Sequence, residues 1–340
     1  MSDASDGVSP GASGDGAPAD EPASDSTARP LPAHVRPKRS GFEQQVAHAR
    51  AEFEEANARI TQRTGRNLIL AILIGLAIGA VVFVSLVFLK WIFVVFATAA
   101  ALLGVFEFSR ALQASGRRID VVVQLIAGAA VLLSAYFLDG SVHWVTLFVG
   151  LAVIIVWRLI GQMAARDGRR YGEVVDDVLV SGLVLLYVPF LASLALILLR
   201  QDGGEWWVMA FLIVAIAADT GAYASGLAFG KHPMAPRISP KKTWEGFAGA
   251  AVAVMIAGVL LAWLMLGLPW WTGLIFGLVI LGTATAGDLG ESMIKRDLGI
   301  KDMSSWLPGH GGVLDRLDSI LPSAVAALAL FYLLTPLAVT

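Results

Sequence analysis

The sequence of 340 residues contains no cysteine, which excludes disulfide frameworks, cysteine zinc sites and thiol catalysis. Charge is also scarce: 15% of the residues are Asp, Glu, Lys or Arg, against about 25% in average soluble domains. The net charge of −2 gives no reason to expect a nucleic-acid partner. No cleavable signal peptide is visible, because the first strongly apolar run begins near Asn67, behind a long polar leader. With 56% hydrophobic residues, a soluble enzyme with one large core is excluded.

The few charged residues are unevenly placed along the chain. Residues 1–66 hold 18 of them, 10 acidic and 8 basic, so 34 remain for the other 274 positions. That second part contains several long apolar runs, each close to the roughly 20 residues that a helix needs to cross a bilayer. The sequence therefore predicts an all-α, polytopic integral membrane protein.

The N-terminal part divides into two segments by composition. Residues 1–40 are rich in Ser, Gly, Ala, Pro and Asp, which predicts a disordered leader. In residues 41–66, apolar residues recur at helical spacing among several arginines. This segment is predicted to be an amphipathic juxtamembrane helix on an anionic membrane face, or else a solvated helix leading into the first span. Residues 67–340 are predicted to form one polytopic catalytic membrane domain.

We expect about nine transmembrane helices from the apolar runs. The runs lie near residues 67–84, 88–110, 120–138, 142–162, 177–199, 205–229, 245–266, 270–294 and 314–336. The first two share a short connection and should form a tight helical hairpin. No internal repeat is evident, which weakens an interpretation as an inverted-repeat transporter.

The basic residues of the connecting loops predict the orientation of the chain in the membrane. If the N-terminus is cytoplasmic, 15 Lys and Arg residues lie on inner connections, and only Lys90 and Arg200 lie on outer ones. Cytoplasmic loops carry such an excess of basic residues. We therefore expect a multi-pass protein of the cell membrane with its N-terminus on the cytoplasmic side.

Carboxylates inside apolar runs are costly, and by default they indicate function. Asp219 lies in the sixth run. In the eighth, Asp288, Glu291, Ser292 and Lys295 share one helical face, because they follow i, i+3, i+4, i+7 spacing. The ninth run begins with two further aspartates, Asp315 and Asp318.

All these acidic groups approach the side predicted to be cytoplasmic. Carboxylates that converge at one depth repel one another unless a cation joins them, and ligands that are all oxygen suit a hard cation such as Mg²⁺. The alternative is a set of interhelical or local ion pairs, for instance between Asp288 and Lys295.

Two loops carry features of phosphate binding. The stretch Ser239-Pro-Lys-Lys-Thr-Trp-Glu-Gly places hydroxyls, Lys241 and Lys242 before the N-terminus of the seventh run. Pro308-Gly-His-Gly-Gly precedes Asp315, and glycine backbone can approach a phosphate closely. Each loop also has a plainer explanation, since inner loops are basic and turns favour Pro and Gly. His310 could bind a phosphate or act as a base, although a lone histidine is more often structural.

A hard-cation carboxylate cluster beside such loops fits phosphoryl or nucleotidyl transfer. Because the site is embedded in the membrane, we expect one substrate to be a lipid.

The stretch from Ser292 to Asp318, SMIKRDLGIKDMSSWLPGHGGVLDRLD, resembles the signature of the phosphatidate cytidylyltransferases, or CDP-diacylglycerol synthases. The Asp-Thr-Gly-Ala-Tyr of the sixth run, the Ser-Pro-Lys-Lys-Thr-Trp-Glu-Gly block and Gly-Asp-Leu-x-Glu-Ser also resemble this family, in the expected order. The resemblance covers roughly residues 67–336. It implies that CTP and phosphatidic acid react to CDP-diacylglycerol and pyrophosphate for phospholipid biosynthesis, with Mg²⁺ required.

The resemblance also implies roles for single residues. The metal ligands would be Asp219, Asp288, Asp315 and Asp318, holding Mg²⁺ either alone or with a second, monovalent cation. These four and Lys295 form the expected catalytic set. The expected substrate-binding residues are Ser239, Lys241, Lys242, Ser292, Arg296, Lys301, His310, Gly311, Gly312 and Arg316. A homodimer is a family-level expectation.

Three other functions would use the same residues differently. A cation-coupled secondary transporter needs polar access from both faces, whereas the charges here gather on one side. Another lipid-linked transferase would share the carboxylates but not the 27-residue signature. A non-catalytic scaffold would tolerate Asp→Asn at all four aspartates.

Overall fold

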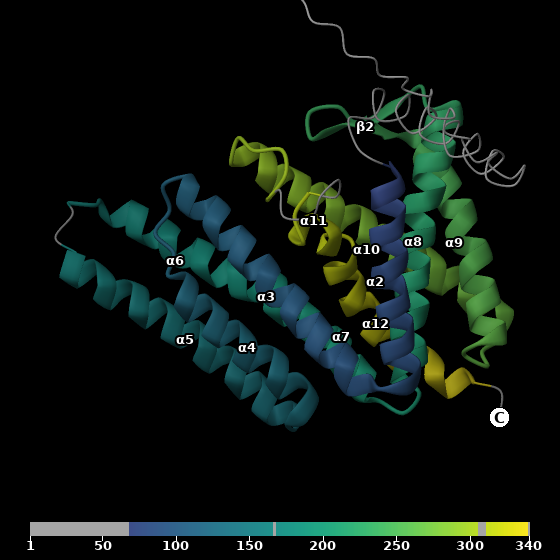
Figure 1. Cartoon of the computed structure of the whole chain (residues 1–340), viewed down its shortest axis with the longest axis horizontal. Coiled ribbons are helices and arrows are strands. Elements are labelled where there is room, and N and C mark those ends of the chain that lie inside the picture. Colours follow the sequence, from purple (N-terminus) through teal and green to yellow (C-terminus); the bar gives the residue numbers. More distant parts are fainter. Residues whose placement is uncertain (1–67, 166–167, 305–310, 339–340) are drawn as a thin grey trace, which may run out of the picture. The chain divides into compact units, whose positions relative to one another are not determined.

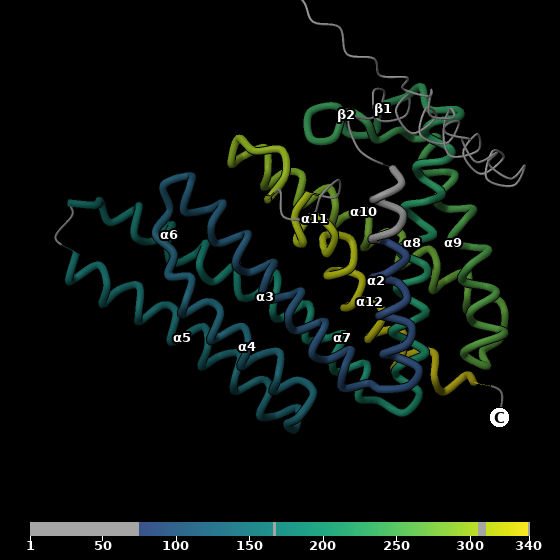
Figure 2. The backbone as a smooth tube through the Cα atoms, in the orientation of Figure 1, coloured from purple at the N-terminus to yellow at the C-terminus, as the bar shows by residue number. Residues whose placement is uncertain are grey.

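A computed structural model describes residues 68–165, 168–304 and 311–338 of the chain. The predicted leader and juxtamembrane helix lie outside the described residues. The described part is almost wholly helical, as predicted, and its strands form a single two-stranded sheet (Figures 1 and 2). An apolar segment buried in lipid can satisfy its backbone polar groups only within a helix or a closed barrel, which explains this outcome.

The helices follow the predicted apolar runs. In chain order they are α2 (Leu68–Phe88), α3 (Lys90–Ala114), α4 (Val121–Phe137), α5 (Gly140–Ala165), α6 (Tyr171–Leu185), α7 (Leu191–Arg200), α8 (Gly204–Phe229), α9 (Trp244–Leu264), α10 (Trp270–Asp297), α11 (Leu314–Leu317) and α12 (Ile320–Leu334). A π-helical turn η1 (Leu186–Phe190) joins α6 to α7, and a 3₁₀ turn η2 (Thr335–Leu337) follows α12.

Within the described residues, seven helical segments are long and apolar enough to cross a membrane. The other two predicted spans correspond to shorter apolar helices, Gly75–Phe88 within α2 and the 17 residues of α4. The fifth span is the continuous segment Tyr171–Arg200, which begins before the predicted boundary. Pro189 lies in its π-helical turn, where the missing N–H and the ring are accommodated.

The helices of the C-terminal half approach one another through small residues. A Cβ added to Gly258 on α9 would overlap the carbonyl oxygen of Gly273 on α10, and one added to Gly273 would overlap that of Gly258. Between α8 and α9, a Cβ on Gly221 would lie 2.7 Å from that of Ala253. Small residues let membrane helices pack backbone against backbone. This packing holds α8, α9 and α10 together beneath the candidate site.

A polar hairpin joins α8 to α9. Strands β1 (Pro233–Ala235) and β2 (Ser239–Thr243) pair antiparallel, so the predicted phosphate loop is in fact a strand. Glu245 fixes its base by accepting the backbone N–H groups of Lys231 and His232 at 3.1 and 3.2 Å. Figures 1 and 2 show the hairpin, the C-terminal end of α10 and α11 toward the same end of the helices.

Candidate functional site

A pocket of about 310 Å³ lies between α8, α9, α10 and β2. Its charged lining is Asp219, Lys241, Lys242 and Asp288; the rest is Tyr223, two threonines, and Gly, Ala, Met, Phe and Leu residues. Asp219 and Tyr223 are exposed, whereas Asp288 is half-buried. Residues of three segments, 18 or more positions apart in the sequence, thus meet at one place.

Asp288 is the centre of the acidic groups. Its Oδ2 lies 2.5 Å from Nζ of Lys242, and its Oδ1 accepts a hydrogen bond of 3.3 Å from Oγ of Ser292. The carboxylates of Asp219 and Asp318 both lie close enough for electrostatic repulsion with Asp288. Gly287 contributes to this closeness, because a Cβ there would overlap the carbonyl oxygen of Asp318. Asp219 and Asp318 are therefore both neighbours of Asp288, and these three of the four predicted aspartates form the acidic group of the site.

Basic side chains offset part of this negative charge. Lys242 and Arg316 both lie near enough to Asp219 to attract its carboxylate. Ser239 and Lys241 lie on strand β2 together with Lys242, and Lys241 is exposed. At the end of α10, Nε of Arg296 donates to the carbonyl oxygen of Ile238 at 3.2 Å, which ties this helix to the hairpin. Lys301 is exposed on the turn after α10 and does not line the pocket.

Lys295 bridges two further acidic residues of the site. Its Nζ lies 2.8 Å from Oε2 of Glu291 and 2.8 Å from Oδ1 of Asp315. Glu291 is fully buried, and the Lys295 side chain is 13% exposed. The alternative of local and interhelical ion pairs is thus confirmed in part. The partners differ from the pair given as an example, because Asp288 pairs with Lys242 and not with Lys295.

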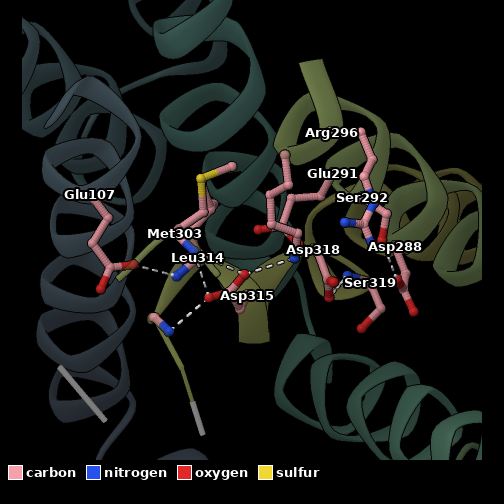
Figure 3. A network of polar contacts seen from close by, with 12 residues as sticks. Glu107, Asp288, Glu291, Ser292, Arg296, Met303, Leu314, Asp315, Asp318 and Ser319 are labelled. Carbon is pink, nitrogen blue, oxygen red and sulfur yellow. Dashed lines mark hydrogen bonds and ion pairs between the residues drawn. The ribbon is translucent and has the colours of Figure 1, made fainter. Parts of the chain in front are cut away.

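Asp315 also holds the loop before α11. Its Oδ2 accepts the backbone N–H of Met303 at 3.0 Å and that of Gly312 at 2.7 Å (Figure 3). Together with Lys295, these donors engage both carboxylate oxygens. Asp315 therefore anchors the signature loop in this structure, and a metal ion at this carboxylate would compete with Lys295.

Glu107 on α3 is a site residue that the sequence analysis missed. It is 2% exposed, and it accepts the N–H groups of Val313 at 3.0 Å and Leu314 at 2.9 Å, and the hydroxyl of Ser304 at 2.5 Å. Figure 3 shows it on the opposite side of Asp315 from Asp288. The signal was present, since a glutamate within an apolar run is as costly as Asp219. It was overlooked because it has no acidic neighbour in sequence.

The two signature glycines are required by these carboxylates. Gly311 has a φ of +82°, a conformation that glycine adopts readily. A Cβ on Gly312 would lie 2.7 Å from Oε2 of Glu107 and 3.0 Å from Oδ2 of Asp315. His310 lies outside the described residues. Phosphate contact by this loop stays a prediction.

The donor chemistry of the site fits a hard cation. Asp219, Asp288 and Asp318 offer carboxylate oxygens that repel one another, the kind of ligand that Mg²⁺ prefers. Among the described residues, no group of three or more His, Cys, Asp or Glu side chains is arranged so that it could hold a metal ion. The four-aspartate metal set and its cations stay predictions.

The fold and the clustered charges define the class: a polytopic membrane protein with a polar site among its helices. Comparison with known proteins agrees. The sequence profile of the Cytidylyltransferase family matches residues 69–334. The chain belongs to this family, which confirms the resemblance drawn from the signature.

Proteins named phosphatidate cytidylyltransferase from several bacteria are similar to this chain. The chain is 43% identical over 274 residues to the phosphatidate cytidylyltransferase of Mycobacterium bovis, covering 78% of this chain and 89% of that protein. It is 39% identical over 286 residues to that of Mycobacterium leprae, covering 81% and 90%. The match to the Haemophilus influenzae protein of this name, 39% over 155 residues, covers 43% and 54%.

Proposed function

We propose that the chain transfers the cytidylyl group of CTP to phosphatidic acid, giving CDP-diacylglycerol and pyrophosphate. The observation that carries the proposal is the pocket where Asp219 and Asp288 face Lys241 and Lys242 at the end of apolar helices. Such a pocket suits phosphate groups on a substrate that is partly buried in lipid. The printed names of the relatives support the same reaction.

In this reaction an oxygen of the lipid phosphate attacks the α-phosphorus of CTP. The bond between the α-phosphorus and the bridging oxygen breaks, and pyrophosphate leaves with the electron pair. The nucleophile is an already ionised phosphate monoester, so a strong general base is unnecessary. The work of the protein is then to position two anions and to offset their charge.

The chain supplies that positive charge at several places. Lys241, Lys242, Arg296 and Arg316 are proposed to neutralise the triphosphate and the lipid phosphate. Lys295 is buried between Glu291 and Asp315. Its proposed part is to hold the signature loop in place, so that Gly311, Gly312 and His310 line the nucleotide.

Asp219, Asp288, Asp315 and Asp318 are the proposed metal ligands. A bound Mg²⁺ would supply charge neutralisation at the phosphates. The excess of basic residues on one side supports a cytoplasmic position for the N-terminus and the site.

The pocket also limits how much substrate it holds at once. Its 310 Å³ lies at the lower end of small-ligand pockets, which span roughly 300–1,000 Å³. We infer that it receives the reacting phosphates, while the acyl chains remain between the helices and the bilayer.

The test is incorporation of labelled CTP into lipid by the purified full-length protein in mixed micelles containing phosphatidic acid. The expected result is a Mg²⁺-dependent labelled CDP-lipid with release of pyrophosphate. Replacing phosphatidic acid with diacylglycerol should abolish the product, because the attacking phosphate is then missing. A protein that forms no CDP-lipid at any substrate level, but moves cations across proteoliposomes, would be a transporter instead.

A further inference from the structure

A second, larger pocket lies away from the candidate site. It has a volume of about 790 Å³ and lies between the C-terminal end of α3, the start of α4 and the C-terminal end of α5. None of its lining residues lines the pocket that contains Asp219. Four arginines, Arg110, Arg117, Arg118 and Arg158, form much of its polar surface. All four are on the side that the loop charges predict to be cytoplasmic.

A buried aspartate, Asp177, holds Arg158 and the backbone of Arg118 in place. Asp177 on α6 is fully buried; its Oδ2 lies 2.6 Å from Arg158 and 2.5 Å from Arg169, and its Oδ1 accepts the backbone N–H of Arg118 at 3.1 Å. Arg169 also donates to the carbonyl oxygen of Gly116 at 2.6 Å. Arg169 thus links Asp177 to the α3–α4 connection.

The charges of this surface do not cancel. Three aspartates of the described residues lie at this surface. Asp120 lines the pocket, Asp176 lies 2.7 Å from Arg117, and Asp177 pairs with Arg158. The lining of the pocket has four arginines and one aspartate, and the described partner of Arg110 is the neutral side chain of Gln113, at 3.4 Å. Asp120 is further engaged, because it caps α4 by accepting the N–H groups of Val122 and Val123. An anionic group is the matching ligand for this lining.

An apolar groove continues from this pocket along α4 and α5. It has a volume of about 550 Å³ and shares Asp120, Val122 and Trp157 with the basic pocket. Small residues, Ala127, Ala130 and Gly150, make room for it. Its one hydroxyl, on Thr146, donates to the carbonyl oxygen of Val142 at 2.8 Å within its own helix. The groove therefore presents hydrocarbon alone below its polar end.

Trp157 marks the boundary between the two parts. Its indole N–H donates to Oδ2 of Asp120 at 2.7 Å, while the side chain is exposed and lines both cavities. Tryptophan is enriched where membrane hydrocarbon meets the head groups. A ligand that spans this boundary has a charged end and an apolar end.

We propose that the two cavities form a binding site for an anionic phospholipid, separate from the candidate active site. The lipid phosphate lies among Arg110, Arg117 and Arg158, and one acyl chain lies in the groove between α4 and α5. Basic pockets between membrane helices on the cytoplasmic side bind lipid head groups in this way. A free nucleotide would leave the groove empty, and the cationic head of a zwitterionic lipid would meet a surface that is already positive.

The experiment measures lipid retention by the purified full-length protein. Native mass spectrometry is run after titration with phosphatidylglycerol, phosphatidic acid or phosphatidylcholine at matched concentrations. We expect both anionic lipids to be retained over phosphatidylcholine, and the comparison between them separates a phosphodiester from a phosphomonoester ligand. The double variant Arg110→Gln/Arg117→Gln should bind about 30-fold more weakly, since each basic residue contributes roughly fivefold.

Two further variants complete the test. Ala130→Trp should fill the groove and weaken retention without touching the arginines, because Ala130 is exposed and lines the groove. Arg170→Gln is the matched control: it removes an exposed arginine from the same side that does not line the pocket. Equal retention of all three lipids, or unchanged retention in both pocket variants, would overturn the proposal. So would cross-linking of a second copy of the chain through a photoreactive residue at Ala130.

Discussion

The carboxylate of Glu107 accepts the backbone N–H of Leu314 at 2.9 Å and thereby joins two residues 207 positions apart in the sequence. It connects the second predicted span, which carries none of the family motifs, to the start of α11, where the signature ends. Hydrogen bonds to a charged acceptor contribute about 1.5–3 kcal/mol each. The signature loop therefore depends on a helix from the other half of the chain.

Glu107→Gln should reduce kcat/KM by about tenfold or more, because an amide cannot accept from both Val313 and Leu314 as a carboxylate does. Glu107 is a positioning residue in this account. Steady-state kinetics should show a higher KM for CTP as well as a lower kcat. The matched control is Glu205→Gln, which removes a half-buried carboxylate paired with Lys90 at the other end of the helices. If only thermal stability fell, with kinetics unchanged, Glu107 would be merely structural.

Gly312→Ala should inactivate the enzyme without preventing its insertion in the membrane. The added methyl would meet Oε2 of Glu107 and Oδ2 of Asp315, neither of which can withdraw without losing its hydrogen bonds. We expect a loss of activity larger than tenfold, on the scale of overpacking costs of about 1–3 kcal/mol. The control is Gly282→Ala, where nothing lies within 4 Å of the new atom. Equal activity of the two variants would contradict the loop geometry.

Lys295→Met should cost several kcal/mol of stability, about 3–5 by the usual effect of breaking a buried ion pair. It leaves two buried carboxylates, Glu291 and Asp315, without their shared ammonium group. The double variant Lys295→Met/Glu291→Gln should recover part of the loss, since one charge is removed. Thermal unfolding in detergent, followed by size-exclusion fluorescence, measures both. No recovery in the double variant would mean that Glu291 does not share the charge of Lys295.

Asp288→Asn and Asp315→Asn should differ in kind. Asp288 is half-buried, so its replacement should lower turnover roughly 100-fold or more, as removal of a charge-stabilising group does, at little cost in stability. Asp315 is buried with three donors, so its replacement should lower stability by about 3 kcal/mol as well. Activity against Mg²⁺ concentration should shift for Asp288→Asn. Near-full turnover with an unchanged Mg²⁺ requirement would remove Asp288 from the ligand set.

The helices were largely predictable because an apolar run in lipid has few alternatives. Helices lie at all nine predicted positions. Only α4 and the segment Gly75–Phe88 of α2 are short for a membrane span. The hairpin of β1 and β2 was not predicted, since its polar residues show no alternating pattern. Its strand pairing depends on Glu245, whose contacts to Lys231 and His232 no local rule indicates.

The acidic groups were predictable as a set but not in their pairing. The spacing along the eighth predicted span placed Asp288 and Glu291 on a common face. The structure agrees, because both carboxylates lie near the carboxylate of Asp318. The partners of Lys295 and Lys242 depend on how three elements meet in space. That arrangement is fixed by close contacts such as Gly287 against Asp318, which a single sequence does not reveal.

The backbone contact between Gly258 and Gly273 has a mechanical consequence for substrate entry. Gly258 lies 12 residues along α9 from Gly246, which lines the pocket, so the contact is roughly 18 Å deeper at helical rise. Because no side chains separate the two helices at this point, α9 and α10 are in direct backbone contact there. Any widening between α9 and α10 for an entering head group is therefore expected toward the hairpin end, where the pocket lies.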